Sequence, residues 1–475
     1  MKWNSAMHSS VATAQWLVGL SVLSGLMGCA GTPEGRPDPS APRPNIVLIV
    51  ADDLGYGDLG CYGQDRIKTP FLDLMAGEGM RFTQHYAASP TGAASRCALL
   101  TGKHSGTATI RNDAPTVLMK DDELTVARLL RQQGYATACL GKWGVGHPPP
   151  PDDPLQAGFD HFFGYLSRYH ASNGYPEFLW RNSAKTPLRN QVVRPESFNP
   201  PAQRQFVGTA SKREDYAQDL FTLEAINWIE QQQQPFFLML CYTLPAANPQ
   251  AGTVEVPDLG GYRETDWPEA EQAKAAAISY LDRDIGRIIA ALRRQGIDKK
   301  TLVLFTSDNG PHADGGVNPN YLDSTGPLRG HKGQLYEGGI RVPLIARWPG
   351  TISPDTVSDH LSGGWDLLPT IAELVGLRKI DEIDGHSLMA TLRGKYASQK
   401  KHRYLYWETG WEDPSELSQA VRIDNWKAVR PKADMPVELY NLLSDPHERI
   451  NLADSYRGRV RTAERIMRRY RPDVE

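Results

Sequence analysis

The fold is decided by the stretch Asn45-Ile46-Val47-Leu48-Ile49-Val50-Ala51-Asp52-Asp53. A short, unbroken run of apolar and mostly β-branched residues, as in 45–50, is typical of a strand buried on both faces of a parallel sheet. The run ends on the acidic pair Asp52 and Asp53. Ligands of doubly wound sheets bind beyond the carboxyl ends of the strands, so this pair is expected at a ligand site.

Three further apolar runs follow helical patterns and predict more strands of the same sheet. They lie at residues 135–140, 235–242 and 301–306, after helical segments at about 124–130, 223–229 and 269–294. Asp121 and Asp122 can cap the first of these helices, and Gly134 can end it. Lys142 follows the first of these strands, and Asp308-Asn309 follows the last. The repeated helix-to-strand order predicts a doubly wound α/β sheet with polar residues gathered at one edge.

The texture of the sequence changes after a predicted helix at about 367–375. Short aromatic strands are predicted at 404–407, 420–423, 426–429 and 438–442, and a basic helix from about residue 457. We therefore expect a large domain over 45–392 and a small antiparallel subdomain over 393–475.

The N-terminus has the pattern of a bacterial lipoprotein signal peptide. Lys2 precedes an apolar stretch from Trp16 to Leu26, which is short for a bilayer span, and Gly28-Cys29 follows at the cleavage position. The prediction is a signal peptide over 1–29, acylation of Cys29, a tether over 30–44 and a location on the periplasmic side of a membrane. The alternative is an ordinary cleaved signal with an incidental cysteine.

Composition limits the class of partner and the use of the other cysteines. The 475 residues are 40% hydrophobic and carry a formal charge of -3, which excludes a field that attracts a polyanion such as nucleic acid over the whole surface. Cys61, Cys97, Cys139 and Cys241 form no CxxC pair, and disulfides cannot be assigned. Cys139 and Cys241 sit in apolar runs and are expected in the core.

The two polar strand ends together supply a set of oxygen ligands. Asp52, Asp53, Asp308 and Asn309 offer three carboxylates and one amide oxygen, which suit Ca²⁺ or Mg²⁺, with calcium favoured because no rigid octahedron is evident. Taken singly, each pair is more often an acidic turn than a ligand.

Two longer stretches change that weighing. The segments 44–63 and 86–106 contain Asp52-Asp53-Leu54-Gly55-Tyr56-Gly57-Asp58 and Ser95-Arg96-Cys97-Ala98-Leu99-Leu100-Thr101-Gly102, and they resemble the sulfatase family, arylsulfatase type, of the alkaline-phosphatase-like superfamily. The likeness continues through Gly141-Lys142-Trp143-Gly144, Ser307-Asp308-Asn309-Gly310, Leu328-Arg329-Gly330-His331-Lys332-Gly333, Glu337-Gly338-Gly339-Ile340-Arg341-Val342-Pro343 and Glu438-Leu439-Tyr440-Asn441-Leu442. The resemblance implies an α/β sandwich: a central, largely parallel mixed sheet between helices, and a small C-terminal antiparallel sheet with a helix.

The resemblance also implies roles for individual residues. In the family two acidic pairs bind calcium, which here are Asp52, Asp53, Asp308 and Asn309. An arginine and two lysines hold the sulfate group, which here are Arg96, Lys142 and Lys332. Fixed cations stabilise the nonbridging oxygens of a sulfate ester without reorganising. The implied partner is a sulfate ester or sulfated glycan.

The sequence departs from the family pattern at the centre of the chemistry. The family motif Cys/Ser-x-Pro-Ser/Ala-Arg, whose first residue becomes the formylglycine nucleophile, aligns with 92–96, where Gly92 has nothing to oxidise. Ala246 stands where the family carries the histidine that protonates the leaving group. Gly144 replaces a further histidine of many members. Formylglycine is therefore not expected as a cofactor.

Two hypotheses remain open at this point. The first is a sulfuric ester hydrolase with an unusual nucleophile, for which Ser89, Thr91, Ser95, Cys97 or a metal-bound water could be proposed. The second is a binding protein that keeps the calcium and the cations and captures sulfated glycans without cleaving them. Loss of a general acid alone typically costs about two to four orders of magnitude in rate, so the residues favour the second hypothesis.

Overall fold

This computed structural model describes residues 43–472 except for 112, 114–118, 120–121, 146–152, 378 and 411–412. The predicted signal peptide and all but the last two residues of the predicted tether lie outside these residues. In the part of the chain that is described, no helix has the length and apolar character needed to cross a membrane.

A ten-stranded mixed sheet forms the centre of the molecule, in the order β13-β2-β12-β11-β1-β10-β4-β5-β6-β7. The five neighbouring strands in its middle are parallel: β11 (Thr301–Ser307), β1 (Asn45–Asp52), β10 (Phe236–Pro245), β4 (Ala136–Lys142) and β5 (His161–Tyr165). The outer strands are β13 (Thr356–Ser358), β2 (Met80–Phe82), β12 (Leu344–Arg347), β6 (Phe178–Arg181) and β7 (Ala184–Pro187). The predicted largely parallel α/β sheet is therefore confirmed, as are the four strands predicted from apolar runs.

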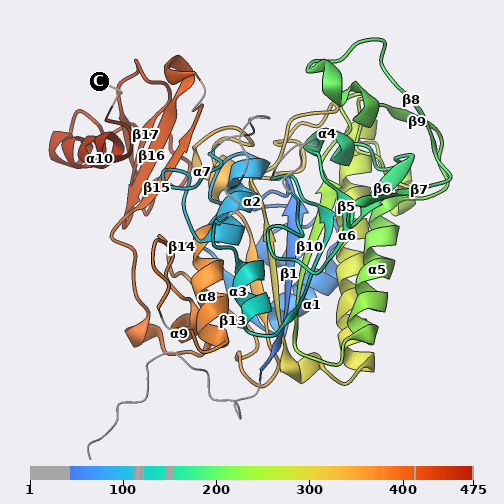
Figure 1. Ribbon diagram of the computed structural model, residues 1–475. Coiled ribbons are helices and arrows are strands. Elements are labelled where there is room, and N and C mark those ends of the chain that lie inside the picture. The colour runs from blue at the N-terminus through green and yellow to red at the C-terminus, as the bar shows by residue number, and fades with distance from the viewer. Residues whose placement is uncertain are drawn as a thin grey trace, which may run out of the picture. The chain divides into compact units, whose positions relative to one another are not determined.

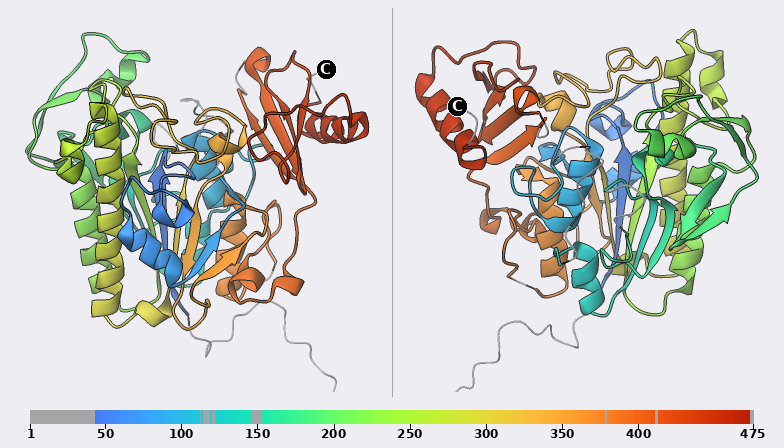
Figure 2. Two further views of the ribbon diagram at one scale, coloured as in Figure 1. Left: turned by 180° about the vertical axis from the view of Figure 1, so that it is seen from behind. Right: turned by 45° about the horizontal axis from the view of Figure 1, so that its top comes forward.

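Both faces of this sheet are covered by helices, which explains why β1 is apolar along its whole length. Val47 and Ile49 belong to the core that includes residues of α1 (Pro70–Gly77), α5 (Ala217–Gln231) and α6 (Glu269–Arg294). Ile46 and Leu48 point to the opposite core, which includes residues of α2 (Gly92–Thr101), α3 (Val126–Gln132) and α8 (Leu367–Leu374). Figure 1 and the view from behind in Figure 2 show α5 and α6 on one side of the sheet and α8 on the other.

The helix expected after Asp121 and Asp122 begins later than predicted. Helix α3 starts at Val126, and the side chain of Thr125 accepts a hydrogen bond from the backbone N–H of Arg128 at 3.1 Å, so Thr125 is the N-cap. Asp121 lies outside the described residues, and Asp122 is exposed in a turn.

Shorter elements connect the main ones. They are β3 (His85–Tyr86) paired with β14 (Ser362–Gly363), β8 (Gln191–Val193) paired with β9 (Thr209–Lys212), and the short helices α4 (Arg168–Ala171), α7 (Glu337–Ile340) and α9 (Met389–Leu392).

The C-terminal residues form the predicted antiparallel sheet and helix. The sheet consists of β15 (Leu405–Thr409), β16 (Ser418–Ile423), β17 (Trp426–Arg430) and β18 (Glu438–Asn441), followed by α10 (Arg457–Tyr470). Val421 on one face packs with Met467 of α10. Trp407 on the other face packs with Tyr86 of β3 and with Trp365, which precedes α8. Figure 1 shows α10 on the outer side of this sheet.

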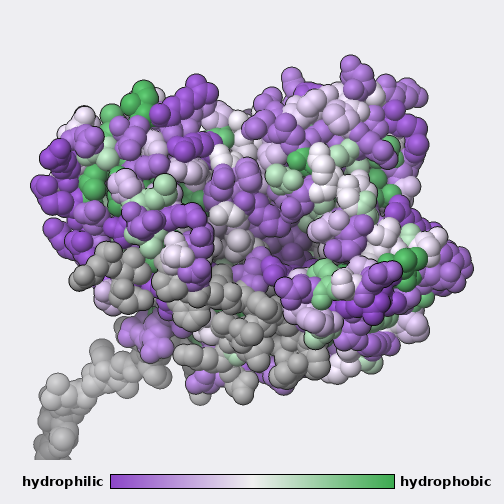
Figure 3. Space-filling view, turned by 90° about the horizontal axis from the view of Figure 1, so that it is seen from above, coloured by the Kyte–Doolittle hydropathy of each residue, from purple (hydrophilic) through white to green (hydrophobic). Residues whose placement is uncertain are grey.

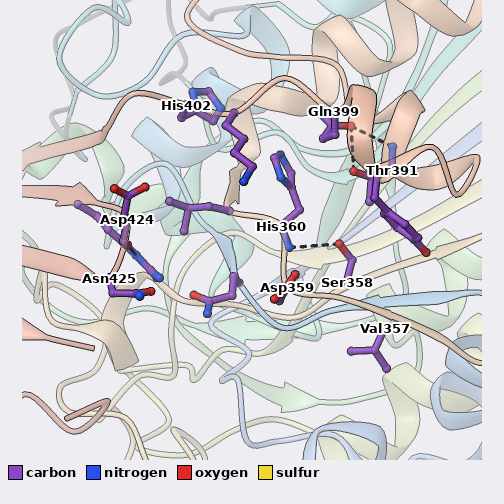
Figure 4. Close-up of a pocket in the computed structure, with 14 residues that line it drawn as sticks. Val357, Ser358, Asp359, His360, Thr391, Gln399, His402, Asp424 and Asn425 are labelled. Carbon is purple, nitrogen blue, oxygen red and sulfur yellow. Dashed lines mark hydrogen bonds between the residues drawn. The ribbon is translucent and has the colours of Figure 1, made fainter. Parts of the chain in front are cut away.

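Gln399 joins the chain between α9 and β15 to α9 by hydrogen bonds. Its side-chain oxygen accepts hydrogen bonds from the backbone N–H and the hydroxyl of Thr391, both at 2.9 Å (Figure 4). Gln399 also lines a cavity of about 540 Å³, together with Lys401, His402 and Arg422. This cavity does not contain any of the sequence-predicted site residues.

Candidate functional site

The carboxyl ends of the parallel strands bring the predicted acidic residues together. Asp52 and Asp53 lie at the end of β1, and Asp308 follows the neighbouring strand β11. One carboxylate oxygen from each of the three lies within 4.8 Å of the others, and all three residues are buried. Seen from above, the surface at this edge has a hollow with hydrophilic residues in it (Figure 3).

A left-handed residue allows two consecutive aspartates to face one site. Side chains of neighbouring strand residues point to opposite faces of a sheet, but Asp53 has a φ of 67° and turns the chain at the end of β1. Its backbone N–H donates to Asp308 Oδ1 at 3.1 Å. Asn309 Nδ2 donates to Asp53 Oδ1 at 2.8 Å, so the amide is oriented by the acidic cluster.

The same residues fit a hard divalent cation. The oxygen of the same amide, Asn309 Oδ1, is buried and has no hydrogen-bond partner among the described residues. Burial and repulsion from Asp52 raise the pKa of Asp308 to about 7, despite the nearby Arg96. A buried amide oxygen without a donor, beside crowded carboxylates, is what an oxygen-ligated metal ion would satisfy.

Each of the three predicted cations contacts at least one carboxylate of the acidic cluster. Lys142 Nζ lies 2.7 Å from Asp52 Oδ2, and Lys332 Nζ lies 2.8 Å from Asp53 Oδ2. Burial would raise the pKa of Asp53, but Lys332 and other nearby positive groups outweigh it and lower the pKa to about 2. The pKa of Lys332 is raised, because Asp53 outweighs the effect of burial.

Arg96 differs from the two lysines in its position. Its side chain is 0% exposed, and its guanidinium contacts Asp308 Oδ2 at 2.9 and 3.0 Å and the backbone oxygen of Lys142 at 3.0 Å. The lysine side chains are partly exposed, at 12% for Lys142 and 30% for Lys332. Arg96 therefore lies behind the acidic cluster and holds it in place.

A cavity of about 340 Å³ opens above the cluster. Its wall includes the predicted residues Asp52, Asp53, Lys142, Lys332, Gly92 and Ala246, and does not include Arg96, Asp308 or Asn309. The structure thus brings most of the predicted site residues to one hollow, from strands and loops that are far apart in the sequence.

Gly92 is the first residue of α2 and faces the acidic cluster. A Cβ atom at this position would lie 2.9 Å from Asp308 Oδ2 and 3.8 Å from Asn309 Oδ1. A side chain at residue 92 would therefore project toward the acidic cluster, and the glycine leaves that space open.

Ala246 lies at the same cavity, and the nearby histidine is engaged elsewhere. The Nε2 atom of His312 lies 3.0 Å from the backbone oxygen of Pro245, and its Nδ1 atom accepts a hydrogen bond from the backbone N–H of Asp314 at 3.1 Å. Burial lowers the pKa of His312, although Asp53 opposes this. With both ring nitrogens used, His312 fixes the loop and does not replace a proton donor at residue 246.

The hydroxyl groups considered as replacement nucleophiles do not line the cavity. Ser89, Thr91 and Ser95 are absent from its wall. Ser89 and Thr91 bond to each other at 3.2 Å, and Ser95 accepts from the backbone N–H of Ala88 at 3.3 Å. Cys97 is buried in the core on the α2 side of the sheet.

Several residues of the wall were not found from the sequence. They are Ala93, Asp113, Arg168, Tyr169, Ala171, Ser172, Phe198, Val207, Ala247, Pro249, Gln250 and Asp314. Ala93 lies within the motif over 92–96, at the position that varies in the family. The others lie in loops and short elements without a periodic pattern or recognised motif, so no signal in a single sequence separates them from ordinary surface residues.

Comparison with known proteins agrees with this geometry. The family model described as "Sulfatase" matches residues 44–377, and that described as "N-sulphoglucosamine sulphohydrolase, C-terminal" matches residues 331–468. The chain is similar to N-acetylgalactosamine-6-sulfatase of Mus musculus, with 31% identity over 98% of this chain and 92% of the relative. It is also similar to arylsulfatase A of Homo sapiens, with 32% identity over 87% of this chain and 84% of the relative.

A solved structure has the same fold. The crystal structure of Ps i-CgsB in complex with k-i-k-neocarrahexaose is 27% identical, with a TM-score of 0.73, and the match covers 91% of this chain and 94% of that one. The match spans both the large central sheet and the small C-terminal sheet of this chain's fold, since it covers 91% of this chain. The chain therefore belongs to the sulfatase family.

Proposed function

We propose that this protein captures sulfate esters of glycans in the cavity beside the acidic cluster, in a calcium-dependent manner, and does not cleave them by the formylglycine route. The observation that carries the proposal is the wall of the cavity. It presents two lysines for a sulfate group, while residues 92 and 246 supply neither a nucleophile nor a proton donor. The ester would thus be bound but not attacked.

The chain's own residues divide the work of binding. Lys142 and Lys332 are partly exposed and would contact the sulfate oxygens as fixed positive charges. Arg96 would act from behind by orienting the carboxylates of Asp52 and Asp308, since it contacts both of them and does not itself line the cavity.

A metal ion belongs to the proposal. Asp52, Asp53, Asp308 and Asn309 would hold Ca²⁺, with Mg²⁺ as the alternative, and the bound ion would supply positive charge next to the sulfate group. The buried oxygen of Asn309, which has no hydrogen-bond partner among the described residues, supports this assignment.

The glycan and the location are extensions of the same proposal. The relatives named N-acetylgalactosamine-6-sulfatase and the complex with k-i-k-neocarrahexaose support a sulfated sugar as the ligand. The pattern up to Gly28-Cys29 supports export and a lipid anchor on Cys29, facing the periplasm. A protein held there would meet sulfated glycans that reach the periplasm.

The test combines binding and turnover by the purified native protein. Retention on a sulfated polysaccharide is measured with calcium and with a chelator, and sulfate release is measured from 4-nitrocatechol sulfate and from the polysaccharide. We expect calcium-dependent retention without release. Lys332→Ala should weaken binding by about 10-fold to 100-fold, the range for losing a hydrogen bond to a charged group. Lys379→Ala, at a side chain that is 85% exposed, is the matched control and should leave binding unchanged.

Two results would overturn the proposal. Metal-dependent release of sulfate would mean that the protein is a hydrolase with an unusual nucleophile. Equal retention of the wild type and Lys332→Ala would mean that the sulfate group does not bind in this cavity.

A further inference from the structure

An ion pair that belongs to neither the acidic cluster nor the lysines forms part of the cavity wall. Asp113 and Arg168 both line the cavity, and Arg168 Nη1 donates to Asp113 Oδ2 at 3.0 Å. Their side chains remain 25% and 33% exposed. The pair therefore stands where a ligand in the cavity can reach it.

Asp113 is held in place from the protein side. Its other oxygen, Oδ1, accepts the backbone N–H of Ala93 in the first turn of α2 at 2.8 Å. The helix of ten residues presents unpaired N–H groups at this end, and the side chain of its N-cap Thr91 makes no capping hydrogen bond. Asp113 thus supplies the cap, which orients its carboxylate beside Gly92.

The hydrogen bonds of Arg168 are incomplete. Nη1 donates to Asp113, and Nη2 donates to the hydroxyl of Tyr169 at 3.1 Å. Its Nε atom is buried and has no hydrogen-bond partner among the described residues. A guanidinium carries five N–H donors in a fixed fork, and Nη1 and Nη2 each carry a second N–H, so this 33% exposed side chain keeps donors for a further acceptor.

The charge of the pair indicates what kind of group it recognises. Burial would raise the pKa of Asp113, but Arg168 outweighs it and lowers the pKa, while the pKa of Arg168 is raised. Both groups are therefore ionised, and their charges cancel. A neutral pair does not form a second anion site; it offers one acceptor and one set of donors, which suits a hydroxyl group.

Two aromatic side chains complete this part of the wall. Tyr169 and Phe198 both line the cavity, and their ring centroids are 5.5 Å apart in an edge-to-face arrangement. Ligand sites typically combine such apolar surfaces with a few placed polar groups that fix orientation. The apolar face of a sugar ring, with its hydroxyls at the rim, matches this combination.

We propose that Asp113 and Arg168 select the organic part of the ligand by hydrogen bonding to hydroxyl groups of the sugar that carries the sulfate, with Tyr169 and Phe198 against its ring. The protein would then bind sugar sulfates in preference to aryl or steryl sulfates. This inference rests on the proposed function, because it requires a sulfate group between Lys142 and Lys332.

The experiment compares two ligand classes in the calcium-loaded full chain. Affinities are measured by titration calorimetry for a panel of monosulfated galactose and N-acetylglucosamine isomers and for 4-nitrophenyl sulfate. The wild type should bind at least one sugar sulfate about 10-fold or more tighter than the aryl sulfate, the range expected for one or two hydrogen bonds to charged groups. Arg168→Gln and Asp113→Asn should abolish this preference.

The ratio of the two affinities is the decisive readout. Asp113→Asn removes a negative charge near both lysines and can strengthen every sulfate ligand, but a common factor cancels in the ratio. The double variant should lose no more preference than either single variant, because the two residues act as one unit. Arg263→Gln, in an exposed pair with Asp258, is the control and should keep the wild-type ratio.

The failures of the two proposals are distinguishable. If sugar and aryl sulfates bind, Lys332→Ala weakens both, and the ratio stays the same in Arg168→Gln, the selection by this pair is wrong while the proposed function stands. If the wild type binds neither class, both proposals are overturned. Thermal midpoints of the variants within a few degrees of the wild type exclude unfolding as the cause.

Discussion

At the scale of single residues, the acidic cluster is the feature that the sequence and the structure agree on most closely. Asp52, Asp53 and Asp308 were expected together because they end strands of one parallel sheet, and their carboxylates converge. The left-handed turn at Asp53 and the orientation of Asn309 were not expected, because both depend on contacts between the two strand ends.

Calcium should stabilise the protein through this cluster. A ligand that binds only the folded state stabilises it by about 2.7 kcal/mol when present at about 100 times its Kd. We expect calcium to raise the thermal midpoint of the wild type above that in a chelator, and Asp52→Asn to abolish the rise because a carboxylate ligand is lost. Asp258→Asn, at an exposed carboxylate, should respond like the wild type. An undiminished rise in Asp52→Asn would contradict the assignment of the metal site.

At the scale of elements, the packing of α1 on α6 depends on a residue that sequence patterns did not single out. The bounds of α6 agree with the prediction, but Asp282 in its middle is only 2% exposed. Its carboxylate accepts the backbone N–H groups of Leu72 at 2.7 Å and Phe71 at 3.2 Å. Asp282 of α6 therefore caps the N-terminus of α1, because the N-cap residue Thr69 makes no side-chain capping hydrogen bond.

The capping carboxylate should give the protein a pH-dependent stability. Burial raises the pKa of Asp282 from 3.8 to about 7, so the folded state keeps a proton there that the unfolded chain releases. This contribution is fully present below about pH 4 and is lost as the pH rises through about 7. As the pH rises over this range, the wild type should therefore lose stability relative to Asp282→Asn. The expected loss in free energy of unfolding is on the order of 2–4 kcal/mol.

Urea unfolding of both proteins at several pH values measures this difference. Because other groups titrate equally in both proteins, only the change in the difference with pH is informative. Parallel curves for the wild type and the variant would show that folding does not change the pKa of Asp282.

At the scale of the whole molecule, a buried ionic cluster joins the C-terminal sheet to helix α7. Lys427 of β17 lies 3.0 Å from Glu337 of α7 and 3.0 Å from Glu448, and all three side chains are 0% exposed. The hydroxyl of Tyr86 donates to Glu337 at 2.7 Å. The small sheet is therefore docked by charges as well as by the aromatic contacts of Trp407.

Removing the lysine should cost far more than removing an exposed one. Lys427→Met removes the cation that lies between Glu337 and Glu448, although Glu337 keeps its contact with Arg341 at 3.3 Å. Breaking a buried pair in this way typically costs about 3–5 kcal/mol. Lys432→Met is the control, because its pair with Glu416 is about half exposed and such pairs contribute about 0–1 kcal/mol. Urea unfolding measures both. Equal losses of stability would mean that the cluster does not hold the sheet in place.

The sequence alone determined those features of this protein that local patterns encode. Apolar runs predicted β1, β4, β10 and β11, because strands buried on both faces must be apolar throughout. The polar residues that follow these strands in the sequence predicted the edge of the sheet at which a site is expected. The motifs predicted the family.

Only the tertiary structure decided how the wall of the cavity is built. Asp113 and Arg168 meet although they are 55 residues apart, one in a loop and the other at the start of the short helix α4, where no periodicity constrains the chain. Arg96, expected to hold the ligand, contacts Asp308 and does not line the cavity. Which charged side chains face a ligand and which support them depends on packing between segments distant in sequence, and a single sequence does not record those contacts.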